Sequence, residues 1–311
     1  MRALVLGSAG SQPTPKAGCN CRLCTLAREE GGRALRTGPS LYLPDAGLLV
    51  DTPEEANLQL AGRGLSPRRV AWTHAHPDHA AGMRVVQFLA QSAGRPVEGL
   101  VPRPLYPVLA ERYSLDYLID AGYLELRLLP VGKPLELDGL RLTALAHEMD
   151  EPVFAYVFES DSGRGLYAPD HLRFLPLPEG GFDWAVVQMP IPPLAALPFE
   201  LPPDHEAWQS FYTFEQALEL WRGRTDRLVF THIYESVGMT PEELDAVAAS
   251  GGGWVAFAHD GMEVGSVKAG GEADRLERFR AEQQKIERDF AGDPKQMRAE
   301  LRRLWQRFKD E

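Results

Sequence analysis

The stretch Val70-Ala71-Trp72-Thr73-His74-Ala75-His76-Pro77-Asp78-His79 joins an apolar run to four polar side chains. The apolar run predicts a buried strand, and the polar residues follow where this strand ends and a helix begins. His74 and His76 alternate along the chain and can point the same way. Asp78 and His79 follow on the turn. Imidazole and carboxylate groups are the ligands that borderline divalent metals prefer. Three of the eight histidines of the chain lie here, which argues against a chance group of solvated side chains, so the stretch predicts a metal site.

The chain as a whole has the composition of a globular protein. It has 311 residues, of which 44% are hydrophobic and 25% charged, enough for one large domain or two ordinary ones. There are 33 Lys and Arg against 44 Asp and Glu, so the net charge is −11. Because long nucleic acids are bound mainly by Lys and Arg that displace counterions, this charge argues against duplex DNA or long RNA as a partner.

Neither a membrane span nor a signal peptide is predicted. No apolar run approaches the roughly 18–20 residues that cross a bilayer. The apolar stretch at 1–7 is too short for a signal peptide and is interpreted as a first strand. We therefore expect a cytoplasmic protein.

Short β-rich runs between glycine and proline turns, with helices among them, predict mixed layers of helix and sheet. Strands are expected at 3–6, 41–43, 48–50, 70–73, 140–145, 154–159, 184–187, 228–231 and 254–257. Helices are expected at 54–62, 81–91, 107–120, 214–221 and 241–249. Thr213 and Thr240 are suitable N-cap residues for the last two helices. The proline-rich stretch 190–203 predicts a surface loop rather than a strand.

The end of the chain differs from the rest. From Glu272 onward charged residues dominate, and apolar residues recur at heptad-like spacing on both sides of Gly292-Asp293-Pro294. Each segment covers about two heptads, fewer than the three or four that indicate a coiled coil. We expect one domain over 1–268 and a charged, amphipathic helical tail over 269–311. The tail either packs on its own domain or pairs two chains in a homodimer.

The three cysteines of the chain, Cys19, Cys21 and Cys24, lie within six residues. An odd, clustered set is a poor framework for disulfides, so metal ligation is the better interpretation. The spacing brings three thiolates together on one turn, and thiolates suit zinc in a closed tetrahedral site.

The H-x-H-x-D-H pattern of residues 74–79, placed after a strand, resembles the signature of the metallo-β-lactamase superfamily. Two further stretches narrow the resemblance: Gly18-Cys19-Asn20-Cys21-Arg22-Leu23-Cys24 and Ala258-His259-Asp260-Gly261-Met262-Glu263-Val264. Together they are similar to the phosphoribosyl cyclic phosphate phosphodiesterase branch, with the pyrroloquinoline quinone biosynthesis B protein as a cousin. The resemblance spans roughly 1–268. It implies an α+β fold, the αββα sandwich, extended here by a short helical C-terminal segment.

The resemblance also implies a centre of two divalent metal ions, zinc or manganese. One ion is expected on His74, His76 and His147, and the other on Asp78, His79 and His232. Asp170 is expected to bridge them. His147, Asp170 and His232 each follow a β-rich run, and sheet ends that face one way converge on one place. Taken singly, each of these three has an ordinary structural interpretation as a buried histidine or a turn aspartate.

Other polar residues are expected to support the ligands. Asp51 and Asp260 are candidates for hydrogen-bonding the second ring nitrogen of ligand histidines. For both, an ordinary role at a helix start or in a turn is the alternative. His171 and His259 are expected beside the site or at the surface rather than as ligands.

The sequence departs from the family pattern at two sites. Glu235 stands where the phosphodiesterase has a histidine that completes a structural zinc site with the cysteines. A Cys₃Glu zinc site is expected, and metal-free, reduced thiols are the alternative. The extra catalytic histidine of the family falls near Phe211 and Tyr212, so His205 is a candidate substitute, with a plain surface histidine as the alternative.

The expected function is hydrolysis of a small cyclic phosphate diester by a hydroxide that two metal ions activate. The catalytic residues would be Asp78, Asp170 and His205, the last as general acid. Such a centre would carry a local charge of about +1 in a protein of −11, which favours a small anionic substrate over a polyanion. The alternatives are hydrolysis of a cyclic nucleotide, lactone, thioester or other small ester, or a metal-binding accessory protein with little hydrolysis, as the quinone-biosynthesis resemblance allows. The complete ligand set favours the enzyme.

Overall fold

The computed structural model describes residues 1–265 and, further along, residues 285, 286, 288, 290, 296, 297, 300, 301 and 303. The chain divides into two units, Met1–Gly265 and Ser266–Glu311, and the fold described here is that of the first. The amphipathic tail expected over 269–311 lies largely outside the described residues, so its helices and its role in pairing chains stay predictions.

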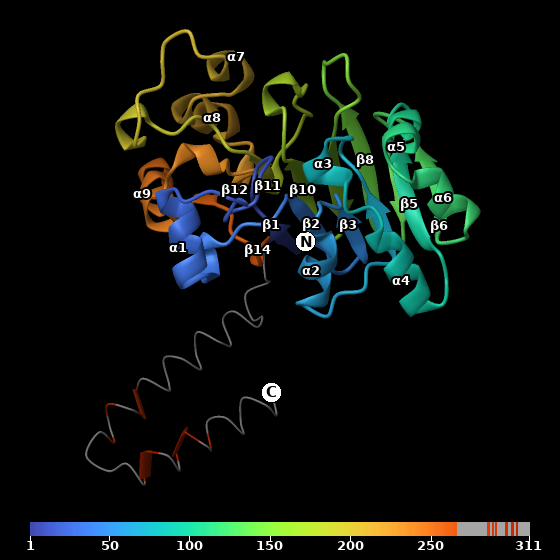
Figure 1. Cartoon of the computed structure of the whole chain (residues 1–311), viewed down its shortest axis with the longest axis horizontal. Helices are drawn as coiled ribbons and strands as arrows, with labels where there is room; N and C mark the ends of the chain where they lie inside the picture. Colours follow the sequence, from blue (N-terminus) through green and yellow to red (C-terminus); the bar gives the residue numbers. More distant parts are fainter. Residues whose placement is uncertain are drawn as a thin grey trace. The chain divides into compact units, whose positions relative to one another are not determined.

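Two seven-stranded mixed sheets form the centre of Met1–Gly265 (Figure 1). The first sheet has the order β14-β1-β2-β3-β4-β5-β6, and the second has the order β13-β12-β11-β10-β9-β8-β7. The strands of the first sheet are β1 (Ala3–Gly7), β2 (Ser40–Leu43), β3 (Leu48–Val50), β4 (Arg69–Ala71), β5 (Val97–Pro102), β6 (Leu124–Leu129) and β14 (Met262–Val264). Those of the second are β7 (Leu135–Leu137), β8 (Leu140–Ala146), β9 (Phe154–Ser160), β10 (Gly163–Ala168), β11 (Phe182–Gln188), β12 (Thr225–Thr231) and β13 (Val255–Phe257).

Central strands of the second sheet such as β9 are buried on both faces, and alternate residues belong to two different cores. In β9, Phe154, Tyr156 and Phe158 pack in a core shared with residues of the first sheet. Ala155 and Val157 of the same strand belong to a second core on the opposite face. Because both faces need apolar side chains, such strands appear in the sequence as continuous apolar runs.

Helices cover the outer faces of the two sheets. Figure 1 shows α8 (Phe214–Trp221) and α9 (Pro241–Gly251) on one side, and α4 (Val85–Ala93), α5 (Tyr106–Arg112) and α6 (Leu115–Asp120) on the other. Trp221 of α8 and Leu244 of α9 are buried in the core on the outer face of the second sheet. Shorter helices are α1 (Arg22–Glu30), α2 (Ala56–Ala61), α3 (Pro77–Ala80) and α7 (Ala207–Ser210). This arrangement confirms the expected α+β sandwich.

Every predicted strand overlaps an observed one, and both predicted N-caps are confirmed. Thr213 and Thr240 each accept a hydrogen bond within a complete capping box, with Gln216 and Glu243 as the reciprocal partners. The stretch 190–203 contains no strand, as expected, but one short 3₁₀ turn (Leu194–Ala196). The single helix predicted over 107–120 is instead two helices, α5 and α6, because the extended backbone of Tyr113 ends α5.

Five strands were not predicted: β5, β6, β7, β10 and β14. In β5 and β6 charged residues interrupt the apolar pattern, because cross-strand ion pairs such as Arg127 with Glu98 replace apolar contacts there. In β10 glycine replaces an apolar residue at Gly165, where an added Cβ would lie 2.2 Å from the ring of Trp184. None of the helices in the described part of the chain has the length and hydrophobicity needed to cross a bilayer.

Candidate metal centre

The predicted ligands follow the carboxyl ends of strands. His74 and His76 lie in the loop between β4 and α3, with His76 as the N-cap, and Asp78 and His79 lie in the first turn of α3. His147 follows β8, Asp170 follows β10 and His232 follows β12. Because β10, β11 and β12 run parallel, the loops after β10 and β12 lie at the same edge of the second sheet. The fold therefore brings together residues that are distant in sequence.

Two adjoining groups of side chains could each hold a metal ion. Within each group, the ligand atoms lie within 4.8 Å of one another. The first group is His74, His76, Asp170 and His171, and the second is Asp78, His79 and His232. Asp170 Oδ2 lies 3.7 Å from His74 Nε2 and 3.6 Å from His232 Nε2, so this carboxylate faces both groups. That is the position expected of a bridging ligand.

Several ring nitrogens in this region are buried and have no hydrogen-bond partner. Among them are Nε2 of His74, His79, His147 and His171. Buried polar atoms are almost always paired. A divalent cation would satisfy these lone pairs, so the chemistry of the donor set fits a metal ion.

Asp51 orients two of the histidines. Its carboxylate is fully buried and accepts from His79 Nδ1 at 2.9 Å and from the Thr73 backbone N–H at 2.7 Å. The Thr73 hydroxyl donates to Asp51 and therefore accepts from His74 Nδ1, 3.0 Å away. With Nδ1 as the donor in both rings, Nε2 of His74 presents its lone pair to the centre, and Nε2 of His79 would do so once a metal ion displaces its proton. The contact expected of Asp51 is therefore present.

The carboxylates control the charge of the second group. Burial lowers the pKa of His79, but Asp51 and Asp78 outweigh this and raise it to about 10. Burial raises the pKa of Asp78, and the neighbouring His79 and His232 reverse that effect and lower it well below its ordinary value. In the metal-free protein the centre is therefore held together by ion pairs between carboxylates and imidazoles.

His147 is a member of neither group, but its Nε2 is buried and unpaired like those of the other histidines, and its Nδ1 donates to the carbonyl of Val153 at 3.2 Å. The sequence placed His171 beside the site because it adjoins Asp170, and the structure puts its ring in the first candidate group. Sequence reasoning missed Gln188, whose amide donates to Asp170 Oδ1 at 2.6 Å, together with the His171 backbone N–H at 2.8 Å. These two bonds occupy Oδ1 and leave Oδ2 facing the histidines. Gln188 carries no signal of its own, since it is simply the last residue of a buried strand.

Residues 45–233 match the family model described as "Beta-lactamase superfamily domain". The chain belongs to this family. The match includes the H-x-H-x-D-H motif and all the other predicted ligands of the two-metal centre, and it confirms the resemblance seen in the sequence.

Solved structures share the superfamily fold over most of the chain. A crystal structure described as a new diphosphatase from the PhnP family is 20% identical, covers 85% of this chain and 97% of its own, and has a TM-score of 0.64. Zn²⁺-bound PqqB from Methylobacterium extorquens is 19% identical, with coverages of 86% and 100% and a TM-score of 0.67. The short form of human tRNase Z is 15% identical, with coverages of 86% and 100% and a TM-score of 0.56.

A curated protein of Porphyromonas gingivalis described as octanoyltransferase is 38% identical over 87 residues, which make up 27% of this chain and 17% of that protein. The chain thus matches only a small part of this relative. Family and fold together support a metal-dependent hydrolase, and the two histidine and aspartate groups can hold divalent metal ions.

Two residues predicted to act at the metal centre have other contacts in the structure. His205 is exposed, and its Nδ1 accepts from the backbone N–H of Ala207 at 3.1 Å. Asp260 is saturated by donors from Ser8 and Thr37, including both backbone N–H groups at 2.9 and 2.8 Å. Asp260 therefore joins two N-terminal loops and does not hydrogen-bond a ligand histidine. Asp260 belongs to the stretch 258–264, which contributes to the family resemblance. That stretch did not reveal which groups the carboxylate would bond.

The cysteine group assembles around Glu235. Glu235 Oε1 lies 2.8 Å from the sulfur of Cys21, 3.4 Å from that of Cys19 and 3.5 Å from that of Cys24. The other oxygen, Oε2, pairs with Lys16 Nζ at 3.1 Å. The thiol of Cys21 and the ammonium of Lys16 help to lower the pKa of Glu235 to about 2, and burial raises that of Cys24 to about 12. These four side chains form a third group with metal-ligand geometry.

We expect this group to hold one zinc ion that survives removal of metal from the histidine centre. Zinc binding would displace the thiol protons, and thiolates bind zinc more tightly than imidazoles and carboxylates do. Metal analysis after chelation should find one zinc per chain, lost in Cys21→Ser and weakened in Glu235→Ala. Lys16→Ala, which removes only the ion pair, is the matched control. Absence of retained zinc in the unmodified protein would end this hypothesis.

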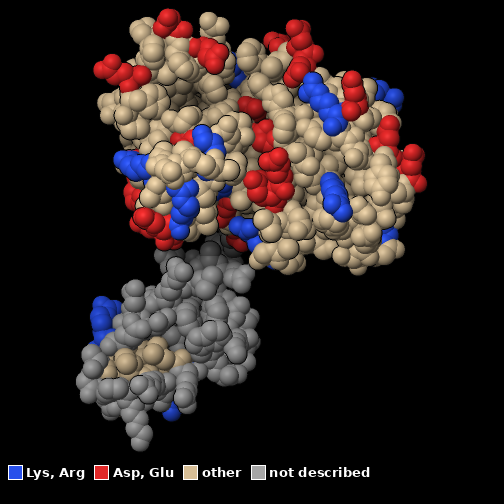
Figure 2. Space-filling model, in the orientation of Figure 1, with Lys and Arg blue, Asp and Glu red and all other residues tan. Residues whose placement is uncertain are grey.

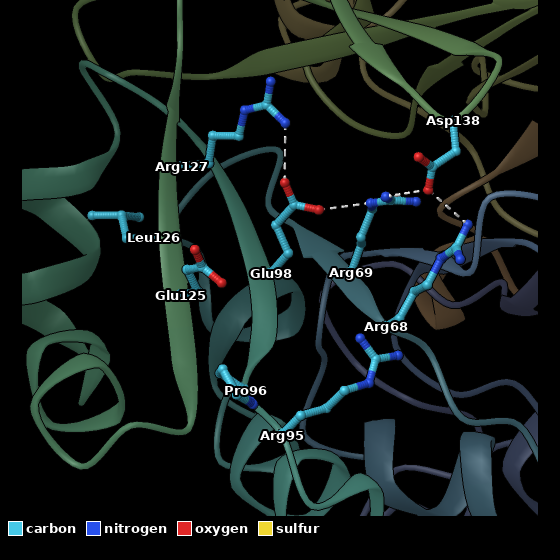
Figure 3. Close-up of a pocket in the computed structure, with 9 residues that line it drawn as sticks. All are labelled: Arg68, Arg69, Arg95, Pro96, Glu98, Glu125, Leu126, Arg127 and Asp138. Carbon is cyan, nitrogen blue, oxygen red and sulfur yellow. Dashed lines mark hydrogen bonds and ion pairs between the residues drawn. The ribbon is translucent and has the colours of Figure 1, made fainter.

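A separate pocket of about 490 Å³ lies at the opposite end of the parallel strands of the first sheet (Figure 3). Its lining includes Arg69, the first residue of β4, whereas the metal centre lies beyond Ala71, the last residue of that strand. Arg69 pairs with Glu98 and Asp138, both at 2.7 Å, and Arg127 pairs with Glu98 at 3.2 Å. This pocket is therefore lined by a network of ion pairs and is distinct from the metal centre.

Proposed function

We propose that this protein is a metal-dependent hydrolase that acts on a small cyclic phosphate diester. The position of Asp170 Oδ2, between His74 of the first group and His232 of the second, carries the proposal. Two divalent ions, zinc or manganese, would supply a lowered pKa for water at the site and would stabilise charge on the phosphoryl oxygens. A single-ion or storage site would not need a carboxylate placed between two ligand groups.

The protein environment holds several ligand side chains in the protonation state that metal binding requires. Asp78 and Asp170 stay ionised at neutral pH, because the surrounding histidines lower the pKa of each. Burial lowers the pKa of His74 well below its usual value and that of His147 to about 4, so both rings are neutral at pH 7. A neutral imidazole with Nδ1 bound elsewhere is prepared to bind a cation through Nε2 without losing a proton.

The opening of the centre lies on the His76 side. The His76 side chain is 36% exposed, whereas those of His74, His79 and His232 are almost completely buried. Glu151, which is half exposed, lies 3.5 Å from His76 Nε2 and pairs with Arg112. Substrate therefore approaches over His76, and the buried side of the centre excludes water.

The charge of the molecule supports a small substrate. The chain carries −11, and on the face drawn in Figure 2 the basic side chains of the described part form no continuous stripe. A polyanion needs such a stripe, whereas one phosphate diester needs only the local positive charge of the centre. We also propose that the protein acts on a small anionic substrate in the cytoplasm, and that it binds neither long nucleic acid nor a membrane.

The experiment compares substrates on zinc-loaded and manganese-loaded protein. We expect hydrolysis of ribose cyclic phosphates and little binding of structured RNA. A lactone and a thioester serve as parallel substrates, and His259→Ala is the matched control, because His259 belongs to none of the ligand groups. Rapid cleavage of structured RNA, or turnover of the lactone or thioester without any cyclic phosphate, would contradict the proposal. Binding of metal without any hydrolysis would favour an accessory protein.

A further inference from the structure

We propose that the hydroxyl group of Tyr234 donates a hydrogen bond to a phosphoryl oxygen of the bound substrate. This inference rests on the proposed function and adds a residue that contacts the substrate at the same site. His205, which the sequence offered as a proton donor, is exposed and accepts from the backbone N–H of Ala207. Tyr234, in contrast, lies against His232, one of the predicted ligands.

The ring of Tyr234 is fixed beside the second group of candidate ligands. It follows His232 by two residues in the loop after β12, and the centroids of the two rings are 5.0 Å apart. The ring of Phe211 packs edge-on against it at 5.5 Å. An added Cβ at Gly10 would lie 2.9 Å from the Tyr234 ring, so the backbone there packs closely against the ring. These three contacts hold the ring in one place next to the centre.

The hydrogen bonds of Gln188 determine how the Tyr234 hydroxyl is used. Oε1 of Gln188 accepts from the backbone N–H of Leu172 at 3.1 Å, so Nε2 is turned the other way. Nε2 donates to Asp170 Oδ1 at 2.6 Å and to the Tyr234 oxygen at 3.5 Å. Because an amide nitrogen can only donate, the hydroxyl of Tyr234 must accept here. Its own hydrogen has no acceptor among the residues that the structure describes.

The surroundings keep this hydroxyl protonated. Burial and the negative charges of Asp170 and Asp78 raise the pKa of Tyr234 well above its usual value. Tyr234 is half-buried, and a hydroxyl that accepts without donating lacks one favourable hydrogen bond. An anionic phosphoryl oxygen suits this hydrogen, because a hydrogen bond to a charged group is roughly twice as strong as one between neutral groups.

A donor at this place would act mainly on the transition state. Negative charge on the phosphoryl oxygens grows as a nucleophile adds to a phosphate diester. A donor that is already fixed nearby stabilises this charge without reorganisation of the protein. Interactions that strengthen in the transition state raise kcat. We therefore expect Tyr234 to contribute to kcat as well as to binding of the phosphate group.

The test compares Tyr234→Phe with the unmodified full-length protein, both loaded with zinc. Binding of inorganic phosphate, measured by calorimetry, should weaken by about 10–100-fold, because a hydrogen bond to a charged group is lost. The kcat on a ribose cyclic phosphate should fall by at least the same factor. Zinc content and the visible spectrum of the cobalt-loaded protein should stay the same, since Tyr234 is not a ligand.

Tyr106→Phe is the matched control. It also removes one tyrosine hydroxyl, which donates to Asp116 at 2.9 Å and joins α5 to α6. This variant should keep its phosphate affinity and kcat. A crystal structure of the zinc-loaded protein with phosphate should place the Tyr234 oxygen within about 2.5–3.0 Å of a phosphate oxygen.

The outcomes separate this inference from the proposed function. Unchanged phosphate affinity and kcat in Tyr234→Phe would overturn the inference and leave the proposed function intact. Loss of zinc or a changed cobalt spectrum in this variant would also overturn it, because Tyr234 would then act on Asp170 through Gln188 and not on the substrate. If the unmodified protein binds neither zinc nor phosphate and turns over no cyclic phosphate, the proposed function fails, and the inference fails with it.

Discussion

Replacement of Asp170 by alanine is expected to abolish hydrolysis and to release at least one metal ion. Asp170 Oδ2 is the oxygen that faces both ligand groups, at 3.7 Å from His74 Nε2 and 3.6 Å from His232 Nε2. Without it, two cations would face each other with no negative charge between them, and their repulsion would grow in the buried site. Metal stabilisation of transition-state charge is worth several kcal/mol. A rate loss of about 10³-fold or more follows, since about 1.4 kcal/mol corresponds to tenfold.

The measurements are metal content after dialysis and the rate on the cyclic phosphate. Asp170→Asn separates charge from shape, because an amide oxygen can still accept from Gln188 and from the His171 backbone. We expect this variant to lose activity as well, since it lacks the negative charge. Full activity in Asp170→Ala would contradict the assigned bridge.

Replacement of Asp51 by asparagine is expected to lower zinc affinity by about 10–100-fold, although Asp51 would touch no metal. Asn can adopt the left-handed φ of +67° found at this position. If its amide oxygen accepts from the Thr73 N–H, its NH₂ group faces His79 Nδ1. The ring of His79 must then accept at Nδ1 and carry its proton on Nε2, where the lone pair is needed.

Stability should fall together with affinity. Asp51 and His79 form an ion pair in which both side chains are completely buried. Removing one partner of a buried pair costs about 3–5 kcal/mol, so the melting temperature of Asp51→Ala should drop clearly. Asp260→Asn is the matched control: its carboxylate is also largely shielded, but it bonds Ser8 and Thr37 instead of a ligand histidine. The Asp260→Asn control should lose stability and keep its zinc affinity. Unchanged zinc affinity in Asp51→Asn would refute the role of Asp51 in orienting His79.

Much of the fold could be predicted from local patterns. The apolar runs of β3, β9 and β12 identify strands because both faces of those strands are buried. The capping residues Thr213 and Thr240 locate helix starts, because their side chains satisfy N–H groups that the helix itself leaves unpaired. The strands that escaped prediction are those whose stability comes from partners, such as the Arg127–Glu98 pair, which sequence periodicity does not reveal.

The sequence by itself determined the kind of site. The spacing of residues 74–79 places three imidazoles and one carboxylate just after one strand, a feature that is local in the sequence. The family follows from the same stretch. Asp51 could also be singled out from the sequence, because a carboxylate directly follows the apolar run of β3.

Only the tertiary structure decided which ring nitrogens converge. That His171 joins His74 depends on where the loop after β10 carries its side chain, and on a left-handed turn at His171 that no sequence pattern indicates. For the same reason, only the structure separated Asp260, which joins two N-terminal loops, from Asp51, which holds His79. Residue type follows from the chemistry of metal ligation, but convergence is set by distances of a few ångströms between segments far apart in the chain. Those distances are set by the packing of the two sheets.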